Sequence, residues 1–387
     1  MQFDLVIVGG GLAGLSLAVA LRATPLSIAV VEERPAPVVP RPPDWDTRVY
    51  AISPANQRFL DRIGAWQRLD HARLAPVRTM EIFGDAGGRL EFSAYDSGAS
   101  ELAWIIESSL LASELWETAK RQGNVTLLCP AAPCSLDIGG EDAQLTLSDG
   151  RIVRTALVVG ADGAESWTRQ AAGIEVSFAP YGEMGTVANF ACELPHRDSA
   201  RQWFREDGVL AWLPLPGNRL SMVWSTPDAH AQELLSLTPR DLCERVAAAG
   251  SWRLGEFSLL TPPAAIPLRL MRAPRCVGPR LALIGDAAHT LHPLSGHGIN
   301  LGLQDSRALA EVLQLRPAHV DCGDERLLRR YERSRREEVI VLQSVTHALQ
   351  RLFQPRHAAL SWLRNSGLNL TNALPVVRGA LVRYALG

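Results

Sequence analysis

Lysine is almost absent from this chain, and several other signals are missing with it. Lys120 is the only lysine in 387 residues, which leaves little basis for Schiff-base or P-loop lysine chemistry. The six cysteines are scattered without a CxxC pair, so the sequence indicates neither a zinc site nor a disulfide framework. No uninterrupted apolar run reaches about 20 residues, which argues against a membrane-spanning helix. These absences favour a reducing compartment, predict no metal site and remove several enzyme classes at once.

Net charge is also small, but it is unevenly distributed. Lys and Arg number 39 against 41 Asp and Glu, so no domain-wide positive field is available to hold nucleic acid. Residues 339–387 contain five arginines and no acidic residue, a net charge of +5, whereas residues 1–338 carry −7. With 47% hydrophobic and 21% charged residues the chain is globular in composition, and its length predicts two or three domains.

The first 32 residues predict a strand, a glycine-rich turn, a helix and a second strand. Residues 5–8 and 27–31 are strand-like, and between them residues 9–14 read GGGLAG and a helix continues to about residue 23. The stretch is apolar enough for a signal peptide, but it has no cationic start and three consecutive glycines interrupt it. The pattern therefore predicts a βαβ unit that binds a dinucleotide.

Each glycine in this unit has its own physical role. Gly9 permits the turn, Gly11 lets the backbone approach a pyrophosphate, and Gly14 lets helix and strand pack closely. The helix N-terminus adds amide donors, with Leu12 and Ala13 in its first turn. Glu32, the first residue after the second strand, stands where a carboxylate accepts the hydroxyls of an adenosine ribose. The alternative is a glycine-rich turn with no ligand.

A second nucleotide-binding signal begins at residue 285. A buried strand is expected at residues 281–284, and it leads into GDAAH at 285–289 and a glycine-rich loop that opens a new helix. Asp286, just past the strand, can accept the hydroxyls of a ribityl chain, with a purely structural cap as the alternative. Gly296 and Gly298 admit a flat ring against bare backbone.

Between these signals the pattern becomes strand-rich. Residues 76–97 predict a hairpin, and residues 110–121 predict a helix that leads into a strand at 125–129. Further strands are expected at 143–147 and 152–159. From about residue 176 to 270 strands dominate, which predicts a second, sheet-based domain.

Three segments together make the sequence similar to the p-hydroxybenzoate hydroxylase-like group A FAD monooxygenases. They are the N-terminal GxGxxG with Glu32, DGAESWTR at residues 162–169, and GDAAHTLHPLSGHGINLGLQD at residues 285–305. The resemblance implies FAD as cofactor and NADH or NADPH as co-substrate, and it places Arg48 near the mobile part of the flavin. For Arg169 a structural salt bridge is the alternative. The cofactor-binding residues that it implies are Gly9, Gly11, Leu12, Ala13, Gly14, Glu32, Arg48, Asp162, Gly163, Arg169, Gly285, Asp286, Pro293, Gly296, His297, Gly298, Ile299 and Asn300.

Other segments narrow the resemblance to the flavin hydroxylases of ubiquinone biosynthesis. They include DTRVYAIS at 46–53, WIIE at 104–107, GVLAWLPL at 208–215 and LRNSGL at 363–368. The resemblance implies hydroxylation of a prenylated phenol or quinol by O2 through a flavin C4a-hydroperoxide. His297 departs from the family, which usually carries Gln there, and this leaves the subfamily open. A hydroxylase of another aromatic compound or secondary metabolite and a non-catalytic flavoprotein scaffold are the alternatives.

By this resemblance the fold class is α/β with mixed α+β character. We expect a Rossmann-like FAD-binding domain, an inserted and mainly antiparallel substrate sheet, and a C-terminal helical tail. The predicted boundaries are 1–75, 98–175 and 275–338 for the FAD-binding domain, 76–97 and 176–274 for the substrate domain, and 339–387 for the tail.

The flavin carries the chemistry in this family, so no protein nucleophile is required. The chain has no GxSxG elbow and no HExxH. His289 and His297 are the catalytic candidates, and for His289 the alternative is a packed, hydrogen-bonded loop residue.

The tail mixes arginine with apolar residues. Arg351, Arg356 and Arg364 lie among leucines and Trp362, a mixture that suits anionic lipid headgroups or an acidic partner such as a ubiquinone-biosynthesis complex. The alternative is a helical pair packed on the flavin domain. We therefore expect a cytoplasmic protein, with peripheral contact at the inner face of a membrane as the further hypothesis.

Overall fold

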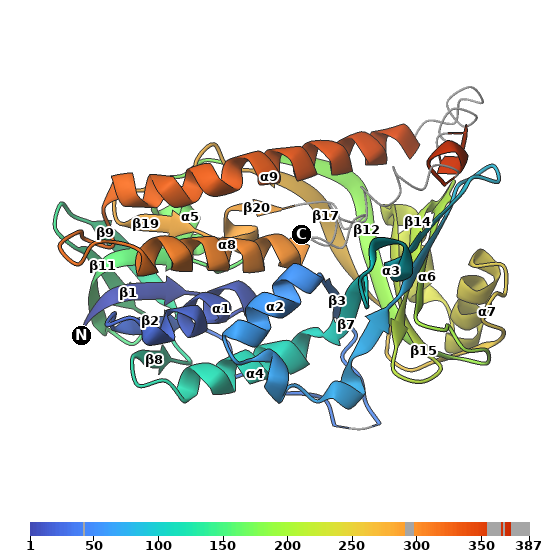
Figure 1. Ribbon diagram of the computed structural model, residues 1–387, viewed down its shortest axis with the longest axis horizontal. Helices are drawn as coiled ribbons and strands as arrows, with labels where there is room; N and C mark the ends of the chain where they lie inside the picture. Colours follow the sequence, from blue (N-terminus) through green and yellow to red (C-terminus); the bar gives the residue numbers. More distant parts are fainter. Residues whose placement is uncertain (42, 291–297, 354–364, 367, 373–387) are drawn as a thin grey trace.

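The computed structural model describes residues 1–41, 43–290, 298–353, 365–366 and 368–372. These residues form two halves that lie side by side along the long axis of the molecule (Figure 1). Helix α9 (Glu325–Phe353) runs along the top from the first half to the second. The predicted mixed α/β architecture with a C-terminal helix is confirmed.

A parallel sheet forms the centre of the first half. Strand β1 (Gln2–Val8) is buried on both faces from Leu5 to Val8, which is typical of a central parallel strand. The parallel strands run in the order β19–β11–β1–β2–β8, β18 pairs antiparallel with β19, and the β9–β10 hairpin pairs through β10 with β11. Their bounds are β2 (Ile28–Val31), β8 (Val125–Leu128), β9 (Pro133–Ile138), β10 (Ala143–Leu147), β11 (Ile152–Gly160), β18 (Val277–Gly278) and β19 (Leu281–Leu283).

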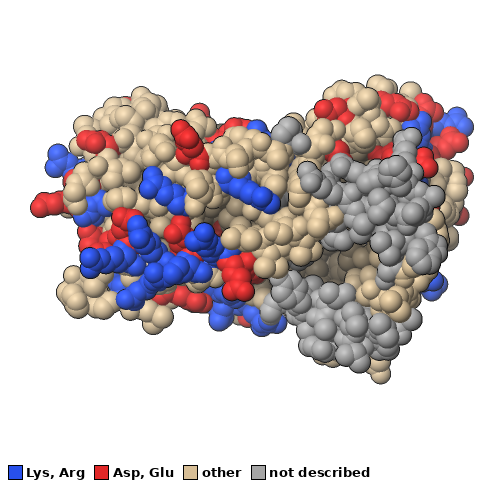
Figure 2. Space-filling model, turned by 90° about the horizontal axis from the view of Figure 1, so that it is seen from above, with Lys and Arg blue, Asp and Glu red and all other residues tan. Residues whose placement is uncertain are grey.

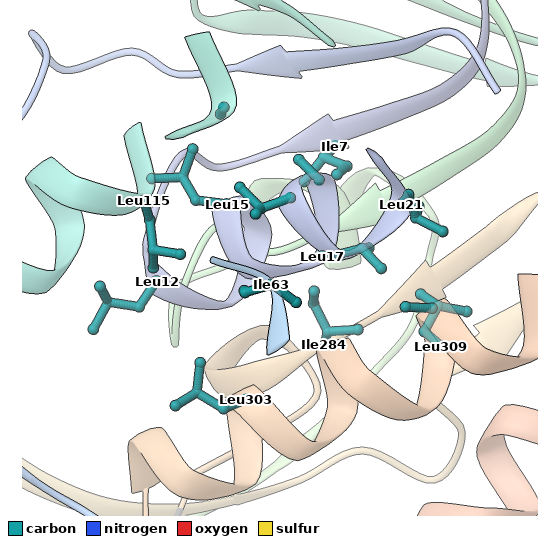
Figure 3. Packing of buried hydrophobic residues seen from close by; sticks show 14 of the residues in the cluster. Ile7, Leu12, Leu15, Leu17, Leu21, Ile63, Leu115, Ile284, Leu303 and Leu309 are labelled. Carbon is teal, nitrogen blue, oxygen red and sulfur yellow. The ribbon is translucent and has the colours of Figure 1, made fainter. Parts of the chain in front are cut away.

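Most of the helices cover one face of this sheet, and the β9–β10 hairpin covers the other together with Trp167 of α5. Leu15 and Leu17 of α1 (Leu12–Ala20) share a buried cluster with Ile7 of β1 and Leu303 of α8 (Figure 3). Because α1 is buried on nearly all sides, it has no polar face. The other helical segments of this half are η1 (Leu21–Ala23), α2 (Pro54–Arg62), η2 (Trp66–Arg68), η3 (His71–Arg73), α4 (Ser108–Lys120), α5 (Trp167–Ala171), η4 (Gly285–Ala287) and α8 (Gly298–Gln314).

A larger sheet forms the second half. Among the described residues its strands follow the order β20–β17–β12–β15–β14–β13–β5–β6, with β16 beside β12, and every pairing is antiparallel except β13 with β5. The bounds are β5 (Thr79–Phe83), β6 (Arg89–Ser93), β12 (Ser177–Cys192), β13 (Ser199–Arg205), β14 (Gly208–Leu215), β15 (Arg219–Pro227), β16 (Phe257–Leu259), β17 (Ala264–Arg272) and β20 (His289–Thr290). One face packs Trp203, Trp212 and Trp224 in a core with residues of α6 (Asp228–Ser236) and α7 (Pro239–Ala249). A short helix, α3 (Ala94–Ser97), follows β6.

A small antiparallel sheet, β3–β7–β4, adds a feature that the sequence did not predict as a sheet. Its strands are β3 (Val49–Ile52), β7 (Ala103–Glu107) and β4 (Ala75–Val77). Their apolar side chains share a cluster with Ala200 and Leu215 of the large sheet. The small sheet therefore packs against the second half.

The large sheet takes its strands from three of the predicted ranges. Strands β5 and β6 of residues 76–97 and the strands of residues 176–274 lie in the large sheet, and so does β20, from a range assigned to the FAD-binding domain. Helix α9 continues through residues 338 and 339, so the boundary drawn there divides a single helix. The other domain boundaries stay a prediction.

The described residues beyond α9 contact the second half. Asn365, Asn369 and Asn372 accept hydrogen bonds from the backbone of the β5–β6 hairpin. The hypothesis of a helical pair on the flavin domain is wrong for these residues, because they dock on the large sheet. Residues 354–364 and 373–387 lie outside the described part.

Candidate functional site

Four strands of the parallel sheet end in one line. Val8 pairs with Val31 on one side and with Gly160 on the other, and Gly160 pairs in turn with Leu283. Because parallel strands present their carboxyl ends at the same edge, the segments after them converge there. These segments are the glycine loop from Gly9, the acidic Glu32, residues 162–169 and residues 285–289. The three predicted motifs thus meet at a single edge.

The glycine loop combines two packed positions with one open position. A Cβ on Gly9, whose φ is +108°, would lie 2.4 Å from the carbonyl oxygen of Ala161, and one on Gly14 would lie 2.1 Å from the carbonyl oxygen of Gly9. A Cβ on Gly11 would meet no atom within 4 Å. Gly11 is the N-cap residue of helix α1, which has neither a side-chain cap nor an acidic residue in its first turn. Its N-terminus can therefore receive an anion, and Gly11 leaves the space for it.

Glu32 lies directly beside this loop. Its Oε2 accepts a hydrogen bond from the backbone N–H of Gly10 at 2.7 Å, and its Oε1 accepts one from the N–H of Arg34 at 2.8 Å. Each carboxylate oxygen keeps a further lone pair for a hydroxyl donor. The backbone thus orients Glu32 at the position expected of a ribose acceptor.

The 162–169 segment is held mainly by its own side chains. Asp162 accepts hydrogen bonds from the Ser166 hydroxyl at 2.5 Å and from the Thr168 N–H at 2.8 Å at the start of α5, and Gly163 has a φ of +82°. The guanidinium of Arg169 is buried and donates to the carbonyl oxygens of Ala287 at 3.0 Å and Ala164 at 2.9 Å. Burial lowers the pKa of Arg169, and the charge of Asp162 opposes that shift.

Arg169 therefore connects two motifs through backbone carbonyls. Among the described residues it makes no ion pair, so the salt-bridge interpretation is replaced by these two hydrogen bonds. Its Nε is buried and finds no hydrogen-bond acceptor among them.

The 285–289 loop presents one carboxylate outward. Gly285 has a φ of +60°, a backbone conformation that favours glycine, and a Cβ there would lie 3.3 Å from the Ala13 Cβ of α1 and 3.7 Å from the Gly302 Cα, so three segments touch closely. Asp286 stays exposed at the surface of the loop. Desolvation by the surrounding loops raises the pKa of Asp286, and the positive charges of His289 and Arg48 oppose the shift. Of the residues predicted here, Pro293, Gly296 and His297 lie outside the described part of the chain.

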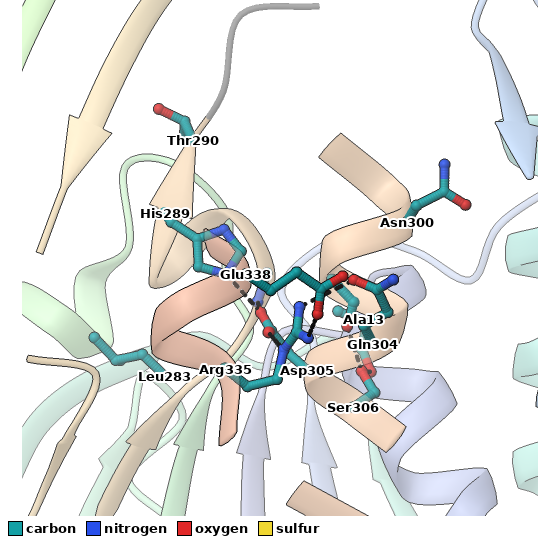
Figure 4. Close-up of polar contacts among 12 residues, drawn as sticks. Ala13, Leu283, His289, Thr290, Asn300, Gln304, Asp305, Ser306, Arg335 and Glu338 are labelled. Carbon is teal, nitrogen blue, oxygen red and sulfur yellow. Dashed lines mark hydrogen bonds and ion pairs between the residues drawn. The ribbon is translucent and has the colours of Figure 1, made fainter. Parts of the chain in front are cut away.

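A buried ionic network connects the 285–289 loop to α8 and α9 (Figure 4). His289 Nε2 lies 2.7 Å from Asp305 Oδ2, which also accepts the Gly285 N–H at 2.9 Å. Arg335 of α9 donates to Asp305 Oδ1 at 2.8 Å and forms an ion pair with Glu338. These contacts favour the packed role for His289 over a catalytic one.

The charges in this network shift one another. Burial lowers the pKa of His289, but the charge of Asp305 and the hydrogen bond to it outweigh burial and raise the pKa above its usual value. Burial raises the pKa of Asp305, and His289 and Arg335 together bring it below its usual value. Sequence reasoning missed Asp305 and Arg335 because their partners are 16 and 30 residues away in the chain.

Helix α8 starts with residues that were predicted to line the flavin ring. The Asn300 amide donates to the carbonyl of Ala51 at 2.8 Å and accepts from the Ser53 N–H and the Asn56 amide, both at 2.9 Å. A Cβ on Gly298 would meet nothing within 4 Å, and Ile299 is partly buried against the main core. Asn300 thus fastens α8 to β3 and α2.

Arg48 lies on a loop that a buried ion pair fixes. Arg73 Nε lies 2.6 Å from Glu107 Oε2, and Glu107 also accepts the Asp46 N–H at 2.6 Å. The Arg48 guanidinium lies over the Tyr50 ring at 5.3 Å, within the electrostatic influence of Asp286. Sequence reasoning missed Arg73 and Glu107, although a glutamate at the end of an apolar strand was a signal for a buried partner.

The large sheet presents an uncharged central surface on the face opposite α7. Along β14 and β15 the residues that face α7 are buried, whereas Ala211 and Val223, which pair across the strands, are half-buried, as is Val187 beside them on β12. Next to them Asn189 Oδ1 and Ser221 Oγ are buried and have no hydrogen-bond partner among the described residues. These positions were not predicted as a site. Small apolar side chains with a few neutral polar atoms suit a neutral, mostly apolar ligand.

The outer side of α9 carries a charged stripe. Arg326, Arg330 and Arg333 are exposed at helical spacing, and Ile340 and Val341 follow on the same side with exposures of 51% and 40%. Figure 2 shows basic side chains gathered on the face that α9 crosses. Within the described residues, every helix is too short or too polar to cross a bilayer.

Comparisons with known proteins agree with this arrangement of motifs. Residues 2–344 match the family described as FAD binding domain. The chain is 34% identical over 386 residues to the 3-demethoxyubiquinol 3-hydroxylase of Escherichia coli (strain K12), and the match covers 99% of this chain and 98% of that protein. It is also 34% identical over 388 residues to ubiquinone hydroxylase UbiL of Rhodospirillum rubrum, with 99% of this chain and 89% of that protein covered.

A solved structure shares the fold at low identity. The crystal structure of p-nitrophenol 4-monooxygenase PnpA from Pseudomonas putida DLL-E4 superposes with a TM-score of 0.80, covering 100% of this chain and 98% of that chain at 16% identity. At that identity the likeness concerns the fold alone.

Proposed function

The chain belongs to the FAD-dependent monooxygenases, and from this membership we propose that it hydroxylates the ring of a prenylated phenol or quinol with O2 and NADH or NADPH. The observation that supports this most is the convergence of the glycine loop, residues 162–169 and residues 285–289 at one sheet edge. The names of the two relatives, both hydroxylases of ubiquinone or a ubiquinol, motivate the substrate class.

FAD is the cofactor, and the residues at this edge fit it. Gly11 leaves room for a pyrophosphate at the open N-terminus of α1, Glu32 offers acceptors for a ribose, and the exposed Asp286 offers them for a ribityl chain. When bound, FAD accepts the reducing equivalents and activates oxygen. The protein binds and orients: Arg169 holds two of the motifs together, and Arg48 supplies a positive charge near Asp286.

The surface of the large sheet supports a neutral substrate. Val187, Ala211 and Val223 form a half-buried apolar patch, and beside it Ser221 and Asn189 have buried oxygens that find no hydrogen-bond partner among the described residues. A phenolic hydroxyl can donate to such an oxygen, and a prenyl chain can bury its methylenes on the patch at about 0.8 kcal/mol each. A carboxylated ring would have no cation among these five residues.

The proposed function is tested by purifying the protein and assaying it with a prenylated phenol. We expect a yellow protein that consumes NADH or NADPH faster when the phenol is added and releases a hydroxylated product. A protein that stays colourless after reconstitution with FAD would contradict a flavin enzyme. A yellow protein that never forms hydroxylated product would instead support the scaffold role.

Replacing Val223 by arginine is expected to weaken the binding of the neutral substrate without changing the affinity for FAD. A cation at the centre of the apolar patch must be desolvated by the incoming ring, so KM should rise by about tenfold or more. Steady-state kinetics with FAD titration measure both properties, and FAD affinity should not change. Val223→Ile, which keeps the patch apolar, serves as the control. Equal KM values for the wild type and Val223→Arg would show that the substrate binds elsewhere.

We also propose that the outer side of α9 contacts an anionic membrane surface. Arg326, Arg330 and Arg333 make no ion pair among the described residues, and the exposed Ile340 and Val341 lie next to them along the helix. Basic residues attract anionic headgroups, and apolar residues beside them can enter the interface.

Neutralising the three arginines should reduce binding to anionic vesicles. At roughly 1 kcal/mol per basic residue near the surface, the triple Arg→Gln variant at 326, 330 and 333 should bind about a hundredfold more weakly. Vesicle co-sedimentation measures this, with the exposed Arg68, Arg154 and Arg240 replaced by Gln as the matched control. If both variants lost the same affinity, binding would follow net charge and not the α9 surface.

A further inference from the structure

Among the described residues, strand β6 forms one edge of the large sheet and β20 forms the other. In the β5–β6 hairpin, Gly84 donates to the Gly88 carbonyl, so alternate residues of β6 point their N–H groups away from β5. Arg89 and Glu91 are two of these residues. An exposed edge strand of this kind invites pairing with another chain, and folded proteins usually cover it or blunt it.

Two asparagines beyond α9 satisfy these outward groups, and a third binds the turn of the hairpin. Asn369 accepts the Arg89 N–H at 2.8 Å, and Asn372 accepts the Glu91 N–H at 3.0 Å. Asn365 accepts the Gly88 N–H at 2.8 Å and donates to Asp85 at 2.7 Å.

The spacing of the asparagines suits this task. Residues 365–366 and 368–372 are helical, so positions 365, 369 and 372 fall on one face. The helix rises roughly 4.5 Å between positions 369 and 372, and the strand rises roughly 6.6 Å between positions 89 and 91, a difference that the Asn side chains can span. The fit is also close at the turn, because a Cβ on Gly84 would lie 2.1 Å from Asn365 Oδ1.

We propose that this segment is an edge clamp, in which Asn365, Asn369 and Asn372 close the open edge of the large sheet in place of a further strand. The clamp holds the β5–β6 hairpin, whose Met80 packs beside the small sheet. Asn369 and Asn372 act only as acceptors to the strand, so a carboxylate can replace either amide. The clamp does not depend on the reaction that the protein catalyses.

The test is hydrogen exchange on the full-length protein with FAD added. In Asn369→Ala/Asn372→Ala the amides of Arg89 and Glu91 should exchange about tenfold faster, because each loses its acceptor. Asn369→Asp/Asn372→Asp keeps both acceptors and should retain wild-type protection. The amides of β1 serve as an internal control for global unfolding.

Either of two results would overturn the proposal. One is unchanged exchange at Arg89 and Glu91 in the Ala variant. The other is equal loss of protection in the Ala and Asp variants while β1 stays protected, since that would mean that the amide shape matters and the acceptor does not.

Discussion

Replacing Gly11 by valine is expected to abolish FAD binding and to leave the apoprotein folded. Among the described residues, a Cβ at this position meets no atom within 4 Å, so the side chain would occupy only the space in which we propose that the pyrophosphate binds. A steric overlap that costs about 3 kcal/mol would reduce the affinity for FAD by about a hundredfold or more. Flavin fluorescence titration of the apoprotein measures the affinity, and thermal unfolding without FAD measures the stability.

Gly14→Val provides the contrasting variant in the same loop. A Cβ there would lie 2.1 Å from the Gly9 carbonyl oxygen, in the packed contact between helix and strand. This variant should lose stability in the apoprotein, whereas Gly11→Val should not. If Gly11→Val unfolded to the same extent, or bound FAD as the wild type does, the assignment of open space at Gly11 to the cofactor would fail.

The meeting of the glycine loops at one sheet edge could be predicted because its signals are local. In the Gly9–Gly14 loop and the Gly285–Asp286 loop, the residues that need a special backbone follow directly on the apolar strand that positions them. Adjacent strand ends then bring the loops together without further information. The family, the mixed α/β fold and the FAD cofactor were all correct for this reason.

The parts that were missed depend on partners far apart in the chain. Asp305 lies between His289 and Arg335, and Glu107 binds Arg73. No periodicity in the sequence predicts such an ion pair, and each of these residues, taken alone, resembles a solvated surface charge. The small sheet was missed for a similar reason, since its three short strands come from segments up to about 50 residues apart.

The half-buried apolar patch and the C-terminal contact could not be predicted without the register of the large sheet. Alternation along β14 shows that one face is buried, but only the pairing of Ala211 with Val223 places the half-buried residues together. The LRNSGL segment contributed to the resemblance, but nothing local tied Asn365 to a hairpin about 280 residues earlier. The composition of the tail suggested that it contacts lipid, a partner or the flavin domain. These three alternatives did not include the edge of the large sheet.

Among the substitutions proposed, removal of the Asp305 carboxylate is expected to lower the free energy of unfolding the most. Asp305 is fully buried and binds His289, Arg335 and the Gly285 N–H at once. Asp305→Ala would leave the buried Arg335 guanidinium without this partner, and breaking a buried pair from one side costs about 3–5 kcal/mol. Denaturant unfolding of the apoprotein near neutral pH measures the difference. A loss below about 1 kcal/mol would show that the network contributes little.

The histidine makes part of this stability depend on pH. The lowered pKa of Asp305 contributes stability above the unfolded value near 3.9, and that contribution is lost as the pH falls through the folded pKa. The raised pKa of His289 contributes stability that is complete below about 6.5 and is lost as the pH rises through its folded pKa. The His289–Asp305 pair should therefore stabilise the folded protein most between about pH 4 and 6.5.

His289→Gln separates the histidine from the rest of the network. Glutamine can still donate a hydrogen bond to Asp305 but carries no charge, so the variant should be less stable than the wild type near pH 5.5 and should approach it at alkaline pH. Asp305→Ala should stay destabilised at alkaline pH because Arg335 remains charged there. A pH-independent difference between His289→Gln and the wild type would mean that the imidazole is neutral in the folded protein and that Arg335 alone neutralises Asp305.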